Sequence, residues 1–101
     1  MAKHVIETVT FKLNEGVSRE DFAKIAEAMN GFVTSRPGFV ARRLSCSADG
    51  EWIEHIEWAD MEAAKGASAA IGSMESNKPF LSAIDGSTVT MRHTELEVSL
   101  S

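Results

Sequence analysis

Two side chains in this sequence have the chemistry of a proton-transfer pair: Glu7 near the amino end and His93 near the carboxyl end. Glu7 alternates with Val5, Val9 and Phe11, which places all four on one face of a strand. If that face is interior, the loss of water raises the pKa of the carboxyl group and makes it a usable general base. The alternative is a structural carboxylate that pairs with an arginine.

His93 shares a strand face with Met91 and Glu95. We expect the last strand to lie beside the first, so that His93 and Glu7 can meet, although the sequence does not set their register. A histidine that is oriented by a carboxylate can move protons near neutral pH. The alternative is a structural histidine that only makes hydrogen bonds.

A second group of candidate site residues occupies every second position within residues 51–58. It consists of Trp52, Glu54, Ile56 and Trp58. In one interpretation these side chains line a cavity, where the tryptophans offer flat apolar surfaces to an aromatic ligand. In the other they pack in the core or in a dimer interface.

The dipeptide Asp49-Gly50 suits the positive φ angles of a tight hairpin turn. A two-residue loop predicts the cross-strand pairs Arg42 with Glu57, Leu44 with His55, and Cys46 with Ile53. This register puts Arg43 on the face of Glu54, where it pairs with that carboxylate, holds an anionic ligand or lies at the surface. It puts His55 on the other face, which we expect to lie against the helices.

Other catalytic and metal-binding patterns are missing from the sequence. No two of the three histidines have helical ligand spacing, and the single cysteine, Cys46, has no CxxC or Cys/His spacing around it. There is no phosphate loop and no GxSxG motif. We therefore predict no metal site and no cofactor, with Cys46 as a small apolar residue.

Strands and helices must position these residues. The predicted strands cover residues 4–13, 39–48, 51–58 and 87–98, and the predicted helices cover 18–35 and 60–74, with a short turn at 80–84. Ser18 and Asp21 form a capping box for the first helix, and Asp60 is the N-cap of the second, which frays near Gly72.

The order β-α-β-β-α-β predicts an α+β, ferredoxin-like fold in a single domain over residues 1–101. Both helices then cover one face of a four-stranded antiparallel sheet. We expect the other face to be rich in apolar residues and to be covered by a second copy, so that a homodimer formed through the sheet faces encloses a chamber.

The composition and charge of the sequence argue against some classes of binding partner. With 44% hydrophobic and 25% charged residues, the chain is typical of a folded domain. The net charge is −5 and the longest basic run is Arg42-Arg43, so no nucleic-acid partner is expected. No segment resembles a signal peptide or approaches the ~18 apolar residues of a membrane span, which predicts a cytoplasmic protein with no membrane partner.

Several segments carry a resemblance that covers nearly the whole chain. They are residues 7–13, 16–17, 36–40 and 50–54, and Trp58 just before 61–64. The chain resembles the dimeric α/β-barrel superfamily, particularly domains similar to antibiotic biosynthesis monooxygenases (ABM-like domains). The resemblance implies a homodimer whose two sheets enclose a barrel that binds a small organic ligand, and several members act without metal or flavin. Stress-responsive barrel proteins are a second relative of the same fold.

The sequence departs from some of these relatives. Haem-degrading members use an Asn on the first strand, near the position of Glu7, and a Trp and a His associated with the second helix. Residues 60–74 contain neither His nor Trp, so the resemblance does not extend to haem degradation. The chain also has no tyrosine, which quinone-forming relatives use to hold a phenol.

These observations favour a small-molecule-binding dimeric barrel with cofactor-independent, monooxygenase-like activity on an aromatic or polyketide-like substrate. Glu7 and His93 would manage protons, while Trp52 and Trp58 form walls and Glu54 or Arg43 anchors polar groups. The alternative is a non-catalytic, stress-related or structural dimer whose interior is filled by side chains. A cavity of roughly 300 Å³ or more, lined by these polar groups, would favour the first hypothesis.

Overall fold

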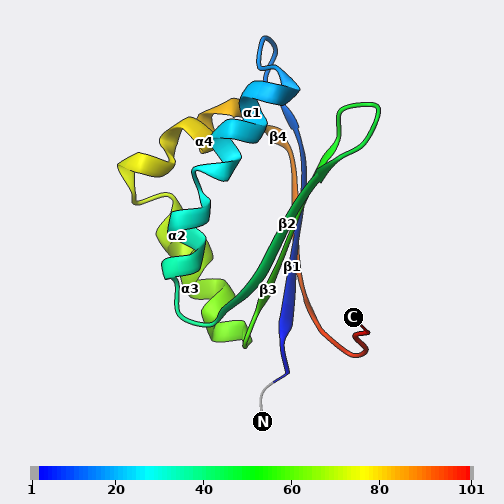
Figure 1. The fold of residues 1–101 in the computed structure, drawn as a ribbon, viewed down its shortest axis with the longest axis vertical. Helices are drawn as coiled ribbons and strands as arrows, with labels where there is room; N and C mark the ends of the chain where they lie inside the picture. Colours follow the sequence, from blue (N-terminus) through cyan, green and yellow to red (C-terminus); the bar gives the residue numbers. More distant parts are fainter. Residues whose placement is uncertain (1–2, 101) are drawn as a thin grey trace.

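Helices cover one face of an antiparallel sheet, and the other face is left open (Figure 1). The structure is a computed structural model that describes residues 3–100; residues 1, 2 and 101 of the predicted domain lie outside it. Within this range the elements are β1 (Val5–Leu13), α1 (Arg19–Glu27), α2 (Asn30–Ser35), β2 (Phe39–Cys46), β3 (Trp52–Trp58), α3 (Met61–Ile71), the 3-10 turn η1 (Glu75–Asn77), α4 (Lys78–Ala83) and β4 (Ile84–Glu95). The predicted α+β, ferredoxin-like fold is confirmed.

Among the described residues, the sheet has the strand order β2-β3-β1-β4, with every neighbouring pair antiparallel. The expectation that the last strand lies beside the first is therefore confirmed. β4 begins at Ile84, three residues earlier than predicted, and ends at Glu95. The early start is possible because Ile84 pairs with Leu13 and Asp85 with Lys12, and a register shift between Thr10 and Lys12 accommodates the extra residues of β4.

The predicted helix over residues 18–35 is two helices. Ser18 is the N-cap, as expected, and its Oγ accepts a hydrogen bond from the Asp21 amide at 3.1 Å. α1 then stops at Glu27, and α2 begins at Asn30. Asn30 and Gly31 are weak helix formers, so the break costs little, and the functional site described below shows what holds it.

The second predicted helix begins where the sequence indicates. The Asp60 carboxylate accepts a hydrogen bond from the Ala63 amide at 2.8 Å, and α3 ends at Ile71 with Gly72 as its C-cap. Among residues 3–100, no helix combines the length and apolar character that crossing a bilayer requires.

The predicted register of the β2–β3 hairpin is wrong by one residue. The Ser47 amide donates to the Glu51 carbonyl at 2.8 Å, so the loop contains Ala48, Asp49 and Gly50, with Gly50 at φ +91°. The Ser47 hydroxyl accepts from the Glu51 amide at 3.0 Å and donates to Asp49, which stabilises this longer turn.

The shift reassigns the faces of β2. The observed pairs are Arg42 with Ile56, Leu44 with Glu54, and Cys46 with Trp52, in place of the three predicted pairs. Arg42, and not Arg43, therefore shares a face with Glu54. His55 lies opposite Arg43 on the open face and does not point toward the helices, as had been expected.

Two apolar clusters join the sheet to the helices. The Phe22 cluster contains Phe11, Phe22, Ala26, Met29, Trp52, Phe80 and Ala83. The Trp58 cluster contains Val5, Val33, Ile56, Trp58, Ala64 and Ala67. The first packs α1 and α4 against one end of the sheet, and the second packs α2 and α3 against the other end (Figure 1).

The open face is more polar than expected. Alternation along the paired strands gives it Ile6 and Ile53 as its large apolar side chains, among the polar residues Thr8, Thr10, Arg43, His55, Glu57, Thr90, Arg92 and Thr94. The expectation of an apolar-rich face is wrong, because most of the large apolar side chains of the strands pack on the helix side: Val5, Val9, Phe11, Phe39, Trp52, Ile56 and Trp58.

Gly38 allows β2 to start close to α3, and replacing it tests this packing. Its φ is +82°, and an added Cβ would lie 2.6 Å from the Cβ of Ala63. We expect Gly38→Ala to lower the free energy of unfolding by about 1–3 kcal/mol or more, because strain and a clash add together. Denaturant unfolding measures this change.

Gly31→Ala is the matched control. Gly31 lies in α2, and a Cβ there would meet nothing within 4 Å. Since alanine is the better helix former, this substitution should leave stability unchanged or raise it by up to about 1 kcal/mol. Equal stability of Gly38→Ala and the unmodified protein would contradict the close approach.

Candidate functional site

A cavity of about 310 Å³ lies between the sheet and the helices, where the two apolar clusters meet. Its wall includes Phe11 and Phe80 from the Phe22 cluster and Ile56 and Trp58 from the Trp58 cluster. The cavity belongs to one protomer and lies on the helix side of the sheet. The cavity of the structure therefore differs in position from the expected chamber, which was to lie between two facing sheets.

Glu7 and His93 lie directly opposite each other on β1 and β4. The strand pairing brings Glu7 Oε1 to 3.4 Å from His93 Nε2, and Glu7 is only 9% exposed. This distance is within ion-pair range but long for a hydrogen bond. His93 Nε2 is buried and makes no aligned hydrogen bond among the described residues.

Trp58 fixes the Glu7 carboxylate from the neighbouring strand. Its indole Nε1 donates a hydrogen bond to Glu7 Oε1 at 3.2 Å, and the side chain is almost completely buried. Among residues 3–100, the second oxygen of Glu7, Oε2, accepts no hydrogen bond. One carboxylate oxygen is thus held in place, and the other is left to accept a hydrogen bond from a ligand.

Burial raises the pKa of Glu7 above its ordinary value of 4.5. The neighbouring Glu54 raises it further, whereas the charge of His93 and the hydrogen bond from Trp58 act in the opposite direction. Loss of water is the largest of these effects, so the carboxylate is a stronger base than a glutamate in solution.

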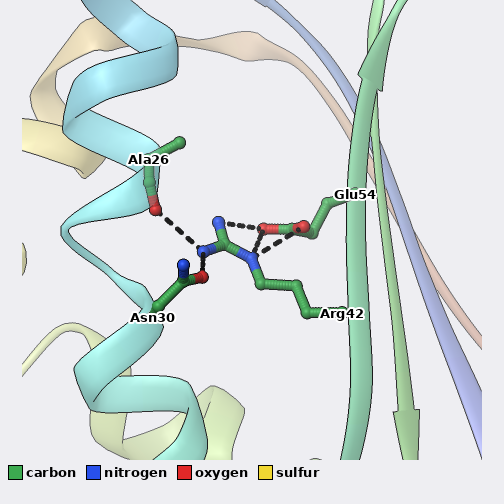
Figure 2. A network of polar contacts seen from close by, with 4 residues as sticks. All are labelled: Ala26, Asn30, Arg42 and Glu54. Atoms are coloured by element: carbon green, nitrogen blue, oxygen red, sulfur yellow. Dashed lines mark hydrogen bonds and ion pairs between the residues drawn. The ribbon is translucent and has the colours of Figure 1, made fainter.

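A second polar network crosses from the sheet to the helices (Figure 2). Arg42 Nε lies 3.1 Å from both oxygens of Glu54, and Nη2 donates to Oε1 at 2.8 Å. Both side chains are only 8% exposed. This bidentate geometry compensates the charge of a carboxylate that would otherwise be costly to bury.

The same guanidinium group holds the break between α1 and α2. Its Nη1 donates to the Ala26 carbonyl at 2.8 Å and to Asn30 Oδ1 at 3.0 Å (Figure 2). In a continuous helix the Ala26 carbonyl would accept from the amide four residues later; at the break it accepts instead from the Met29 amide at 3.0 Å and from the arginine, which stabilises the end of α1. Arg42 therefore couples the strand register to the helix layer above the cavity.

The other candidates from the sequence do not reach the cavity. Trp52 packs edge-to-face on Phe22 with ring centroids 4.8 Å apart, and it borders a smaller hollow of about 210 Å³ beside Arg42. Arg43 is exposed on the open face, because of the one-residue shift in the hairpin. The expectation that Trp52 and Arg43 line the cavity with Glu54 is corrected accordingly; Glu7, Glu54 and Trp58 do line it.

The sequence analysis missed Arg42 and the residues at the cavity mouth. Leu81, Val89 and Met91 line the cavity and are 37%, 42% and 48% exposed, so the opening lies along the β4 edge. Ser68 of α3 also lines the cavity, and its hydroxyl lies 4.0 Å from the Met91 sulfur. Met91 alternates with His93, a signal that could have placed it on this wall; nothing in the sequence singles out Ser68.

The side chains that usually bind metal ions in proteins are those of His, Cys, Asp and Glu. Over the described part of the chain, no three His, Cys, Asp or Glu side chains lie close enough to hold a metal ion together.

The chain is similar in structure to several solved proteins. One is SnoaB, described as a cofactor-independent oxygenase from Streptomyces nogalater, which is 19% identical with a TM-score of 0.69, over 99% of this chain and 97% of that protein. Another is a provisionally assigned antibiotic biosynthesis monooxygenase from Bordetella bronchiseptica, which is 11% identical with a TM-score of 0.79, over 95% and 99%. The Arabidopsis thaliana protein At3g17210 is 18% identical with a TM-score of 0.74, over 95% and 99%.

These likenesses span both chains almost completely and confirm the resemblance at the level of the fold: the chain has the fold of ABM-like, dimeric α/β-barrel proteins. No protein-family model matches the sequence, and no curated protein matches it either. At such low identities a shared fold does not transfer chemistry, so function must be argued from the site.

The raised pKa of Glu7 predicts how stability depends on pH. Because the folded protein holds this proton more tightly than the unfolded chain, stability falls as pH rises from below 4.5 through the folded pKa, and then stays level. Glu7→Gln removes this loss, so its free energy of unfolding should exceed that of the unmodified protein by more at pH 8 than at pH 4. His93, Glu54 and Arg42 are the other charged or titratable groups near Glu7.

Urea unfolding between pH 3.5 and 8 measures the difference, with Glu15→Gln in an exposed turn as the control for a lost charge. A Glu7→Gln curve that runs parallel to that of the unmodified protein over this range would show that Glu7 does not carry the buried charge.

The two adjacent arginines provide a test of the hairpin register. Arg42→Met leaves the Glu54 carboxylate buried without a partner, which should cost about 3–5 kcal/mol of stability. Arg43→Met, on the exposed opposite face, should change stability by less than about 0.5 kcal/mol. Chemical denaturation of both variants measures these changes. A larger loss of stability in Arg43→Met than in Arg42→Met would contradict the observed register and support the one predicted from the sequence.

Proposed function

We propose that this protein binds a small aromatic or polyketide-like molecule in the cavity and oxygenates it without a cofactor, with Glu7 as the proton acceptor. The observation that carries the proposal is the Glu7 carboxylate: it faces an apolar cavity, burial raises its pKa, and His93 lies 3.4 Å away. The fold likeness to SnoaB, a cofactor-independent oxygenase, supports the reaction class.

The reaction needs a substrate that can reduce oxygen by itself. Glu7 removes a proton from an acidic O–H or C–H group, and the resulting electron-rich anion donates electrons to O₂. For a substrate with a reactive CH₂ group, one oxygen atom forms a C=O bond and the other leaves as water, so that RCH₂R′ and O₂ give RC(=O)R′ and H₂O. The substrate loses four electrons and O₂ gains four, and no other reductant is required.

The residues beside Glu7 suit this chemistry, although His93 contacts Glu7 without itself lining the cavity. Trp58 orients the base through its hydrogen bond to Glu7. His93 is placed to take the proton from Glu7 and pass it on, since its Nε2 lies 3.4 Å from Glu7 Oε1. The apolar wall keeps water from the anion, which protects a reactive intermediate from side reactions.

We further propose that two copies associate through the open sheet faces. Thr8 and Thr10 of β1 lie along the middle of this face, Ile6 and Ile53 lie toward opposite ends of the central strands, and Arg43 and Arg92 lie on the edge strands β2 and β4. These apolar and β-branched side chains can pack against a second copy, with the arginines at the rim of the interface. The non-catalytic alternative required an interior filled by side chains, and a cavity of about 310 Å³ argues against it.

Oxygen uptake tests the activity. Incubated with hydroxylated aromatic compounds such as anthrones, the unmodified protein should accelerate O₂ consumption and form the corresponding ketone. Glu7→Gln should lower the rate by about 10²-fold or more, because general-base catalysis contributes about 10²–10⁴-fold. His93→Ala should lower it less, since the histidine acts through Glu7.

Glu15→Gln, which removes an exposed carboxylate far from the cavity wall, should retain full activity. Rates of Glu7→Gln and His93→Ala that equal those of the unmodified protein would remove both residues from the mechanism. Activity that is absent from every compound tested, with no binding, would remove the proposed function itself.

A further inference from the structure

We infer that the cavity selects neutral aromatic ligands with one hydroxyl group that donates a hydrogen bond to Glu7, and that it rejects the carboxylate analogues of these ligands. The inference rests on the proposed function and specifies the ligands that its site accepts. It follows from how the polar groups of the cavity are already engaged.

Arg42 is the cationic side chain of the cavity wall, and its hydrogen-bond donors are already used by acceptors of the protein. All three guanidinium nitrogens donate to protein acceptors, which are Glu54, the Ala26 carbonyl and Asn30. The side chain is 8% exposed and also lies 5.9 Å from the centre of the Phe80 ring. A ligand carboxylate would have to compete with the bidentate Glu54 for this group, and so it gains little there.

Glu7 presents the opposite charge without such compensation. Its partners are an indole N–H from Trp58 and the long contact with His93, so the carboxylate has fewer hydrogen-bond donors than Glu54 in its apolar enclosure. A second carboxylate brought into this enclosure would lose its water and face a like charge. Both effects oppose the binding of an anionic ligand.

A hydroxyl group fits the same place well. Glu7 Oε2 accepts no hydrogen bond among the described residues, and an O–H group that donates to an ionised carboxylate forms a strong bond. The rest of the cavity offers aromatic and aliphatic surface, including Phe32, Phe80 and Trp58. Ser68 near the mouth is the further polar group that can meet the outer end of a ligand.

Three compounds of the same ring system separate these contributions: 2-naphthol, 2-methoxynaphthalene and 2-naphthoate. Equilibrium dialysis at pH 8 measures the dissociation constant of each with the unmodified protein. We expect 2-naphthol to bind about tenfold or more tightly than either of the other two, since a hydrogen bond to a charged group is worth at least this factor. The methoxy compound lacks the donor, and the naphthoate adds the charge.

The variant Glu7→Gln should reduce the preference for 2-naphthol over 2-naphthoate to less than about threefold, chiefly because the naphthoate binds better once the opposing charge is gone. Glu15→Gln should keep the full preference. Glu7→Gln retains an oxygen that can accept from Trp58, and the three-ligand comparison on the unmodified protein tests the inference even if the variant does not fold.

Binding of 2-naphthoate that equals or exceeds that of 2-naphthol would overturn the selectivity and leave the binding cavity in place. The same holds for a preference that Glu7→Gln does not change. If none of the three compounds binds at millimolar concentration, the ligand-binding cavity of the proposed function falls as well. Tight and selective binding without oxygen uptake would support this inference and contradict only the oxygenation.

Discussion

Two carboxylates point from the sheet into the apolar space beneath the helices, and one guanidinium group compensates one of them. Arg42 binds Glu54 through both carboxylate oxygens, whereas Glu7 has a single indole hydrogen bond and a histidine at 3.4 Å. A buried charge is tolerated only where it has a partner or a function. The structure thus separates a carboxylate that stabilises the fold from one that remains available for chemistry.

The architecture around Glu7 follows from the same arrangement. Arg42 bonds to the Ala26 carbonyl and to Asn30 at the break between α1 and α2, so the first helical segment bends over the sheet and does not run straight across it (Figure 2). The helices then pack in two groups, the Phe22 cluster and the Trp58 cluster, and the cavity lies where these groups meet. An ion pair within the fold therefore also shapes the cavity that Glu7 lines.

The periodicity of the sequence was sufficient to predict the element order, both N-caps and the antiparallel sheet, because these depend on local patterns of apolar and capping residues. It also placed Glu7 on one strand face with Val5, Val9 and Phe11, but it did not say whether that face is interior. The hairpin loop depended on whether Ser47 belongs to the strand or to the turn, and that choice is made by its hydroxyl group, which binds the Glu51 amide. One misassigned residue exchanged Arg42 for Arg43. His55 stays on the face opposite Glu54, and the error there was to expect that face to lie against the helices.

The break after Glu27 and the cavity could not be predicted from the sequence, for a different reason. Both depend on contacts between residues far apart in the chain: Arg42 with Ala26, and the packing of α3 and α4 across the sheet. The open face also proved more polar than expected, because alternation does not say which face of a strand lies against the helices, and the more apolar face of β1 and β3 packs there.

The most direct test of this account is the titration of the Glu7 carboxyl carbon by NMR in the unliganded protein, with assignment confirmed by its loss in Glu7→Gln. The account predicts a midpoint above the ordinary value of 4.5, because burial outweighs the contributions of His93 and Trp58. A midpoint at or below 4.5 would mean that Glu7 is as well compensated as a carboxylate in water, and the central claim would be contradicted.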